Sequence, residues 1–148
     1  RGTGILNHSF YEYEFYKGEM PGRTRGVLIA LENGTSVAYG LDALQDRGTI
    51  FIDSGIEVYA GMIIGEHSRE NDLVVNACKG KKLTNMRAAG SDDAVRLIPP
   101  RKFSLEQALE YVENDELLEI TPVSLRMRKK YLDHNERKRF DRSAGKDN

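Results

Sequence analysis

A cationic segment at residues 79–90, with the sequence KGKKLTNMRAAG, has the residue types best suited to binding chemistry in this chain. Lysine and arginine neutralise phosphates, while threonine, asparagine and arginine can hydrogen-bond to sugars and base edges. The segment has no aromatic side chain on which a base could stack. We therefore predict contact with the shape and backbone of RNA through Lys79, Lys81, Lys82, Thr84, Asn85 and Arg87.

The neighbouring elements indicate how this segment is held. The apolar runs Leu73–Cys78 and Ala94–Ile98 flank it and predict two strands. A loop that only closes a hairpin needs about two to five residues. A longer cationic loop with glycines near both ends favours a segment held out towards a polyanion. The alternative is a solvated, flexible surface loop that binds nothing, as many lysine-rich loops are.

The net charge of −1 conceals a strong segregation of charge along the chain. Residues 79–102 contain seven basic and two acidic residues, and residues 103–122 contain six acidic residues and no basic one. Residues 123–148 contain nine basic and four acidic residues. If the fold brings the two basic blocks to one face, that face has the charge of an RNA-binding site. From the second block we predict RNA contacts by Arg126, Arg128, Lys129, Lys130, Arg137, Lys138 and Arg139. The alternative is that these cations are simply solvated and that some of them pair with acidic residues of Glu106–Glu119.

Other chemistries have little support in the sequence. The three histidines lie in separate segments, so we expect no metal site. Cys78 and His67 are the only conceivable nucleophilic pair, but Cys78 stands in an apolar run and predicts a buried, inert thiol. The acidic cluster Glu113–Glu119 lacks the oxygen pattern of a calcium loop. No GxxxxGK[ST] phosphate loop occurs, so we expect no nucleotide site of that type. We do not expect this chain to be an enzyme.

Short apolar runs separated by turn residues predict an α+β domain, dominated by short, mostly antiparallel strands with two or three helices. The sequence Asn33-Gly34 predicts a hairpin turn. Ser104 predicts the start of a helix that ends near Glu113, and Asp133 with Glu136 predicts a capped basic helix to about residue 142. Strands are predicted within 5–13, 25–31, 35–39, 49–52, 62–67, 73–78, 94–98, 117–121 and 124–128.

The domain organisation follows from this pattern. We expect residues 1–16 to be the last strand of a preceding domain, because a lone strand cannot bury its own face. We expect residues 17–142 to form the main domain, opened by a linker at 17–24, and residues 143–148 to be a disordered tail. The single cysteine suits a reducing compartment, so we expect a cytoplasmic location. We also expect a monomer with neither a membrane nor a DNA partner.

Longer stretches of the sequence resemble the carboxyl-terminal region of the BipA/TypA translational GTPases. The residues that match best are EVYAGMIIGEHSRENDLVVN at 57–76 and KGKKLTNMRAAG at 79–90. Further matches are FSLEQALE at 103–110 and EITPVSLR at 119–126. The opening GTGILNHSF at 2–10 resembles the end of that family's domain akin to the fifth domain of elongation factor G. The resemblance covers essentially the whole chain.

The resemblance implies a function. Members of this family are ribosome-associated GTPases, and their amino-terminal domain, which is absent here, binds GTP and Mg²⁺. No cofactor is therefore implied for this chain. The family's carboxyl-terminal domain helps binding in the elongation-factor site, and its loop, matched by 79–90, reaches towards the A-site tRNA and the peptidyl-transferase region. Ribosome biogenesis and translation under stress or cold are the implied processes.

Two functions remain open from the sequence. The first is a noncatalytic module that binds ribosomal RNA and tRNA. The alternative is a protein-interaction domain whose acidic stretch 103–122 positions the GTPase domain or a partner factor.

Overall fold

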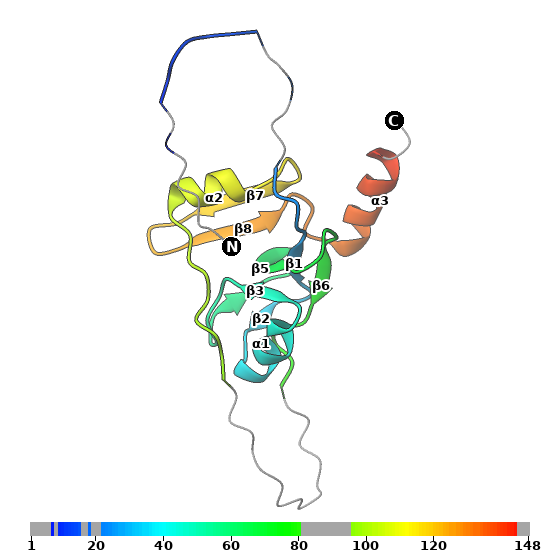
Figure 1. The fold of residues 1–148 in the computed structure, drawn as a ribbon. Coiled ribbons are helices and arrows are strands. Elements are labelled where there is room, and N and C mark those ends of the chain that lie inside the picture. The colour runs from blue at the N-terminus through cyan, green and yellow to red at the C-terminus, as the bar shows by residue number, and fades with distance from the viewer. Residues whose placement is uncertain (1–6, 8, 16–17, 19–21, 81–95, 145–148) are drawn as a thin grey trace, which may run out of the picture.

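The structure, a computed structural model, describes residues 7, 9–15, 18, 22–80 and 96–144 (Figure 1). These residues form eight short strands and three helices, and of six strand pairings only that of β1 with β6 is parallel. The predicted α+β class with mostly antiparallel strands is confirmed. In chain order the elements are β1 (Val27–Ala30), β2 (Gly34–Thr35), α1 (Ala38–Gln45), β3 (Gly48–Ile50), β4 (Glu57–Val58), β5 (Met62–His67), β6 (Leu73–Val75), α2 (Leu105–Tyr111), β7 (Glu116–Ile120), β8 (Leu125–Lys129) and α3 (His134–Ala144).

The central strand of the main sheet is β5. The sheet has the order β6-β1-β5-β8-β7, and β3 also pairs with β5. β1 runs along one edge of β5, while β8 pairs with Met62 and Ile63 on the other edge and β3 pairs with residues 65–67 there. β2 and β4 form a separate two-stranded sheet. β5 therefore has strand partners along both edges.

Two hydrophobic clusters cover the two faces of β1, because successive side chains of a strand point to opposite faces. Leu28 belongs to a cluster that includes Leu41 and Leu44 of α1. Ile29 belongs to a second cluster that includes Tyr111 of α2. All four residues of β1 are buried, as expected for a strand covered on both faces.

The helices α2 and α3 begin at the residues that the sequence predicts. Ser104 caps α2 by accepting the N–H of Gln107 at 3.3 Å, and the Gln107 side chain accepts the Ser104 N–H at 3.0 Å. Asp133 caps α3 by accepting the N–H groups of Asn135 and Glu136 at 2.8 and 3.0 Å. These backbone bonds lower the pKa of Asp133. α3 continues to Ala144, two residues beyond the predicted end of the helix at about residue 142.

The hairpin predicted at Asn33-Gly34 is wrong. A type I′ turn needs positive φ at both residues, and neither has it. β1 pairs with β5 and β6 instead, and β2 pairs with β4. Gly34 lies close to Cys78, since a Cβ at this position would be 2.9 Å from the Cys78 sulfur. The strand predicted at 35–39 is shortened to β2, and α1 begins at Ala38.

Two other predicted strands are not seen in the described residues. Residues 96–98 form no strand, and Gln45 donates to the carbonyl oxygen of Arg96 at 3.1 Å. Residues 9–15 also form no strand, and Phe10, Tyr13 and their aromatic neighbours are at least 75% exposed. No described strand lies beside them to complete a sheet, so their assignment to a preceding domain stays a prediction. None of the described helices is long and apolar enough to cross a membrane.

Candidate nucleic-acid interface

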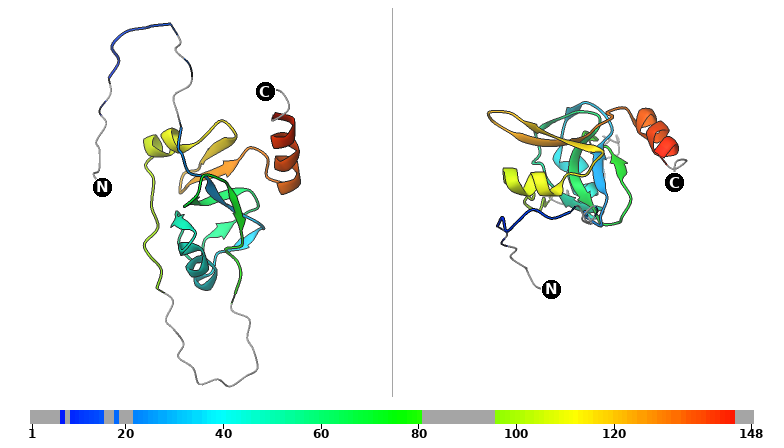
Figure 2. Two further views of the ribbon diagram at one scale, coloured as in Figure 1. Left: turned by 45° about the vertical axis from the view of Figure 1, so that its right-hand side comes forward. Right: turned by 90° about the horizontal axis from the view of Figure 1, so that it is seen from above.

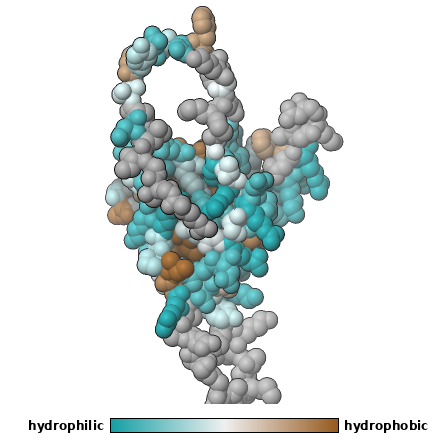
Figure 3. All heavy atoms as spheres, in the orientation of Figure 1, coloured by the Kyte–Doolittle hydropathy of each residue, from teal (hydrophilic) through white to brown (hydrophobic). Residues whose placement is uncertain are grey.

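The outer side of α3 presents a cluster of cations. Lys138, Arg139 and Arg142 are exposed, and Arg142 lies four and three residues after the other two, which makes it their neighbour on the helix surface. Lys130, just before α3, is exposed as well. None of these four side chains forms an ion pair with a residue in the described part of the chain. Figure 3 shows the hydrophilic character of α3.

The inner side of α3 packs against the segment that leads into it. Arg137 donates to the carbonyl oxygens of Tyr131 and Leu132 at 2.8 and 2.6 Å. The ring centroids of Tyr131 and Phe140 are 5.1 Å apart. The predicted contact residue Arg137 is therefore half-buried and holds the helix in place, while its neighbours Lys138 and Arg139 are exposed.

Lys129 lies in the interior. Its side chain is only 3% exposed, and its ammonium lies 2.7 Å from carboxylate oxygens of Asp72 and Asp115 and 2.8 Å from Glu116. With three carboxylates around it, this cation has no open side for a phosphate, so we omit it from the proposed RNA contacts. The burial of Lys129 could have been predicted from the sequence. Successive residues of β8 point to opposite faces, so Lys129 shares a strand face with the buried Met127.

Arg23 completes this buried network, and sequence reasoning missed it. Its guanidinium forms a bidentate pair with Glu116, whose side chain is fully buried. It also donates to the carbonyl oxygen of Tyr111 at 3.1 Å and lies over the ring of that residue. Residues 17–24 read as a linker, and no local pattern distinguished Arg23. Its role depends on contacts with residues about ninety positions away, as the separation of 93 from Glu116 shows.

The network keeps its groups charged. Burial alone would raise the pKa of Glu116, but hydrogen bonds from Arg23 and Lys129 hold it below its ordinary value. Burial would lower the pKa of Lys129, but bonds to Asp115, Asp72 and Glu116 raise it. Oxygens of Glu113, Asp115 and Glu116 lie within 4.8 Å of one another, which could suit a metal ion. Arg23 and Lys129 already supply positive charge at this place.

The two arginines of β8 face an acidic neighbour. Arg128 pairs with Glu119 at 2.7 Å, and Tyr59 donates its hydroxyl hydrogen to the same carboxylate at 2.6 Å. Arg126 lies directly across the strand pair from Glu119 and lines a shallow hollow with Tyr59. Both arginines are half-buried. Arg128 is therefore partly neutralised, unlike the exposed cations of α3, whereas Arg126 forms no ion pair with a described residue.

The two basic blocks lie apart. Lys79 is exposed, whereas Lys81, Lys82, Thr84, Asn85 and Arg87 lie outside the described residues. The described parts of the chain on either side of residues 81–95 end near α1, at the lower end of the domain in Figure 1 and in the left view of Figure 2, whereas α3 lies at the upper right of both views. The described parts of the two blocks thus do not form one continuous patch.

Cys78 and His67 show no sign of nucleophilic chemistry. Burial raises the pKa of the Cys78 thiol, and the negative charge of Glu32 raises it further. A raised pKa disfavours the thiolate, which is the nucleophilic form. His67 is buried, and its Nδ1 hydrogen-bonds to the carbonyl oxygen of Asn71. Both side chains have structural roles.

Comparison with known proteins relates the whole chain to one family. The family model of the TypA/BipA C-terminal domain matches residues 25–134. The chain is 56% identical over 144 residues to the large ribosomal subunit assembly factor BipA of Haemophilus influenzae, covering 97% of this chain and 23% of that protein. It is 52% identical to the protein of that name from Escherichia coli K12, with 99% and 24% covered, and 50% identical to that of Bacillus subtilis, with 94% and 23% covered. The chain thus spans about a quarter of the length of these relatives, and it belongs to the TypA/BipA C-terminal domain family.

Proposed function

We propose that this chain is a noncatalytic, ribosome-binding module of a large ribosomal subunit assembly factor. The names of its relatives and its membership of the family support the ribosome as its partner. In this proposal the basic segment 79–90 reaches towards the A-site tRNA and the peptidyl-transferase region. The cations of α3 form a second contact with RNA.

The observation that carries the proposal is the difference between neutralised and free cations. Lys129 and Arg128 already have carboxylate partners. Lys130, Lys138, Arg139 and Arg142 are exposed and have no acidic partner among the described residues. These unpaired cations repel one another. Binding to a polyanion is favourable for them, because it pairs their charges and releases counterions.

The position of the two basic blocks favours contact with two separate RNA elements. The chain that leads into segment 79–90 lies near α1, at the lower end of the domain in Figure 1, and α3 lies at the upper right of that view. One flat patch would bind one stretch of RNA backbone, whereas two separated groups of cations suit a domain that binds between two RNA surfaces. This arrangement supports recognition of RNA shape rather than of a base sequence.

The alternative, a protein-interaction domain acting through the acidic stretch 103–122, has weaker support. Four of its six acidic residues already contact cations of the same chain: Glu113, Asp115, Glu116 and Glu119. Only Glu106 and Glu110 are exposed without such a partner among the described residues. The stretch is therefore largely neutralised from within.

Co-sedimentation with purified large ribosomal subunits tests the proposal. The first variant replaces Lys79, Lys81, Lys82 and Arg87 with alanine, and the second replaces Lys130, Lys138 and Arg139. The matched control replaces three exposed cations outside the predicted set, Arg47, Arg69 and Lys102. We expect each of the first two variants to lose binding and the control to keep it. Equal retention by all three would contradict the proposal.

A further inference from the structure

The outer edge of β6 is an open sheet edge. β6 ends the main sheet and pairs with β1 on one side, and no other strand in the described part of the chain pairs with its outer side. An open edge presents backbone N–H and C=O groups that another extended chain can bind. Proteins usually protect such edges, so an unprotected one raises the question of what it binds.

The register shows which backbone groups face outwards. In a parallel pair, only alternate residues of a strand bond to a given neighbour. Leu31 donates its N–H to the carbonyl oxygen of Val75 at 2.9 Å, and Ile29 lies opposite Val74. Leu73 and Val75 therefore bond towards β1, and the N–H and C=O of Val74 are directed to the open edge.

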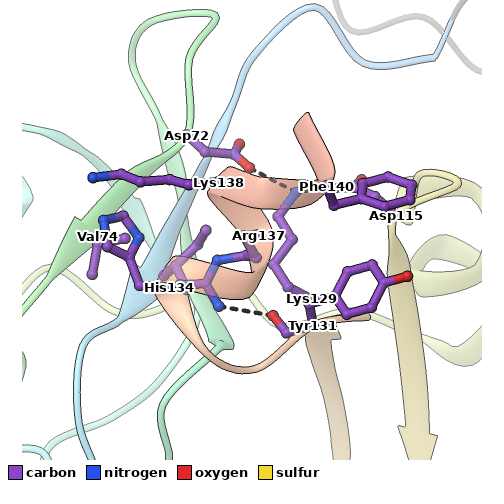
Figure 4. Close-up of a pocket in the computed structure, with 10 residues that line it drawn as sticks. Asp72, Val74, Asp115, Lys129, Tyr131, His134, Arg137, Lys138 and Phe140 are labelled. Carbon is purple, nitrogen blue, oxygen red and sulfur yellow. Dashed lines mark hydrogen bonds and ion pairs between the residues drawn. The ribbon is translucent and has the colours of Figure 1, made fainter. Parts of the chain in front are cut away.

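Two hollows meet along this edge at Val74. One, of about 200 Å³, lies between β6 and α3, and its walls include Ile29, Tyr131 and Phe140 (Figure 4). The other, of about 350 Å³, lies between β6 and α1, and its walls include Tyr39 and Ala43. The edge is thus the floor of a trough between two helices, with a hollow on each side that could receive side chains of an added strand.

The rim of the trough is positively charged. Arg47 and Lys79 line the hollow beside α1, and Lys138 lines the hollow beside α3. All three are exposed and form no ion pair with a described residue. Asp72 offers little opposing charge, because one of its oxygens accepts the Val27 N–H at 2.9 Å and the other pairs with Lys129.

We propose that the β6 edge binds an extended, acidic peptide segment of a protein partner. The segment adds a strand beside β6, bonds to the N–H and C=O of Val74, and places its carboxylates near Arg47, Lys79 and Lys138. The apolar walls and the strand spacing favour a peptide over RNA at this place. Lys79 and Lys138 are also proposed RNA contacts, whereas Arg47 belongs only to this inference and Arg139 only to the RNA contacts.

A designed peptide tests the inference on the intact chain. The probe is an acetylated and amidated heptapeptide, Glu-Val-Glu-Val-Glu-Val-Glu, followed by amide NMR. We expect the shifts of residues 72–76 to change and the exchange of the Val74 amide to slow on binding. A peptide with lysine in place of glutamate should bind about tenfold more weakly. N-methylation of the peptide amides on one strand edge should abolish binding, whereas methylation on the other edge should not.

Variants of the rim and a competing ligand complete the test. Arg47→Glu combined with Lys138→Glu should weaken the acidic peptide about tenfold, while Arg139→Glu, outside the trough, should leave it unchanged. Two results would overturn the inference. One is an absence of shifts at residues 72–76 with about 1 mM peptide. The other is a single-stranded RNA that shifts the same amides and displaces the peptide.

Discussion

Lys129 and Lys130 show how a single step along β8 changes the role of a lysine. Lys129 lies on the inner face with Met127, and three carboxylates surround it. Lys130 follows it on the exposed side and has no acidic partner among the residues that the structure describes. The same residue type therefore acts as an internal ion-pair partner at one position and as a proposed RNA contact at the next.

Replacing Lys129 with methionine should destabilise the fold strongly. The change leaves the carboxylates of Asp72, Asp115 and Glu116 without their shared cation, and breaking a buried pair on one side costs about 3–5 kcal/mol. Lys130→Met is the matched control and should change the free energy of unfolding by less than about 0.5 kcal/mol. Urea unfolding measures both. Equal effects of the two changes would contradict the assignment of Lys129 to the interior.

The buried network also predicts a dependence of stability on pH. The folded-state pKa of Glu116 lies below its unfolded value of about 4.3, so its stabilising effect is complete above that value and is lost as the pH falls through the folded-state pKa. Glu116→Gln should therefore destabilise most near about pH 7, with the difference from the wild type shrinking below about pH 4. Urea unfolding across this range measures it. A difference that stays constant with pH would show that the Glu116 charge has no such role.

At the scale of the elements, close backbone contacts fix how the strands meet. β3 and β5 approach so closely at Gly48 that a Cβ there would lie 1.8 Å from the carbonyl oxygen of Glu66. No side chain can shift to relieve this contact, because the neighbouring atom belongs to the backbone. The pairing that completes the second edge of β5 therefore depends on glycine.

Gly48→Ala should destabilise the fold by about 3 kcal/mol, the upper end of the usual effect of overpacking. Gly80→Ala provides the control, because a Cβ at Gly80 would meet nothing within 4 Å and the residue does not have positive φ. We expect the control to shift the midpoint of thermal unfolding little. A similar loss in both variants would mean that the β3–β5 contact is looser than described.

At the scale of the whole molecule, local patterns predicted the elements well but not their pairing. Apolar runs located β5, and capping residues located the starts of α2 and α3. The Asn33-Gly34 hairpin failed because pairing of β1 with β5 and β6 overrides a local turn preference. Arg23 and Asp72 joined the network around Lys129 through contacts distant in sequence, which no local pattern contains.

The candidate site, too, could be predicted from the sequence only in part. Charge along the chain located the basic blocks, since exposed lysine and arginine follow directly from composition. Which cations remain unpaired depended on the tertiary structure, because Glu116 and Glu119 come from β7 to neutralise Lys129 and Arg128 of β8. The separation of Lys79 from α3 was likewise a property of the fold.

The most direct test of the central claim is the salt dependence of binding to large ribosomal subunits. Each phosphate that a cation neutralises contributes about −0.7 to −0.9 to the slope of log affinity against log salt concentration. Removing Lys79, Lys81, Lys82 and Arg87 together should flatten the slope by roughly 3 units, and removing Lys130, Lys138 and Arg139 should flatten it by roughly 2. The control at Arg47, Arg69 and Lys102 should retain the wild-type slope. Unchanged slopes in both test variants would show that neither basic block contacts RNA and would contradict the account.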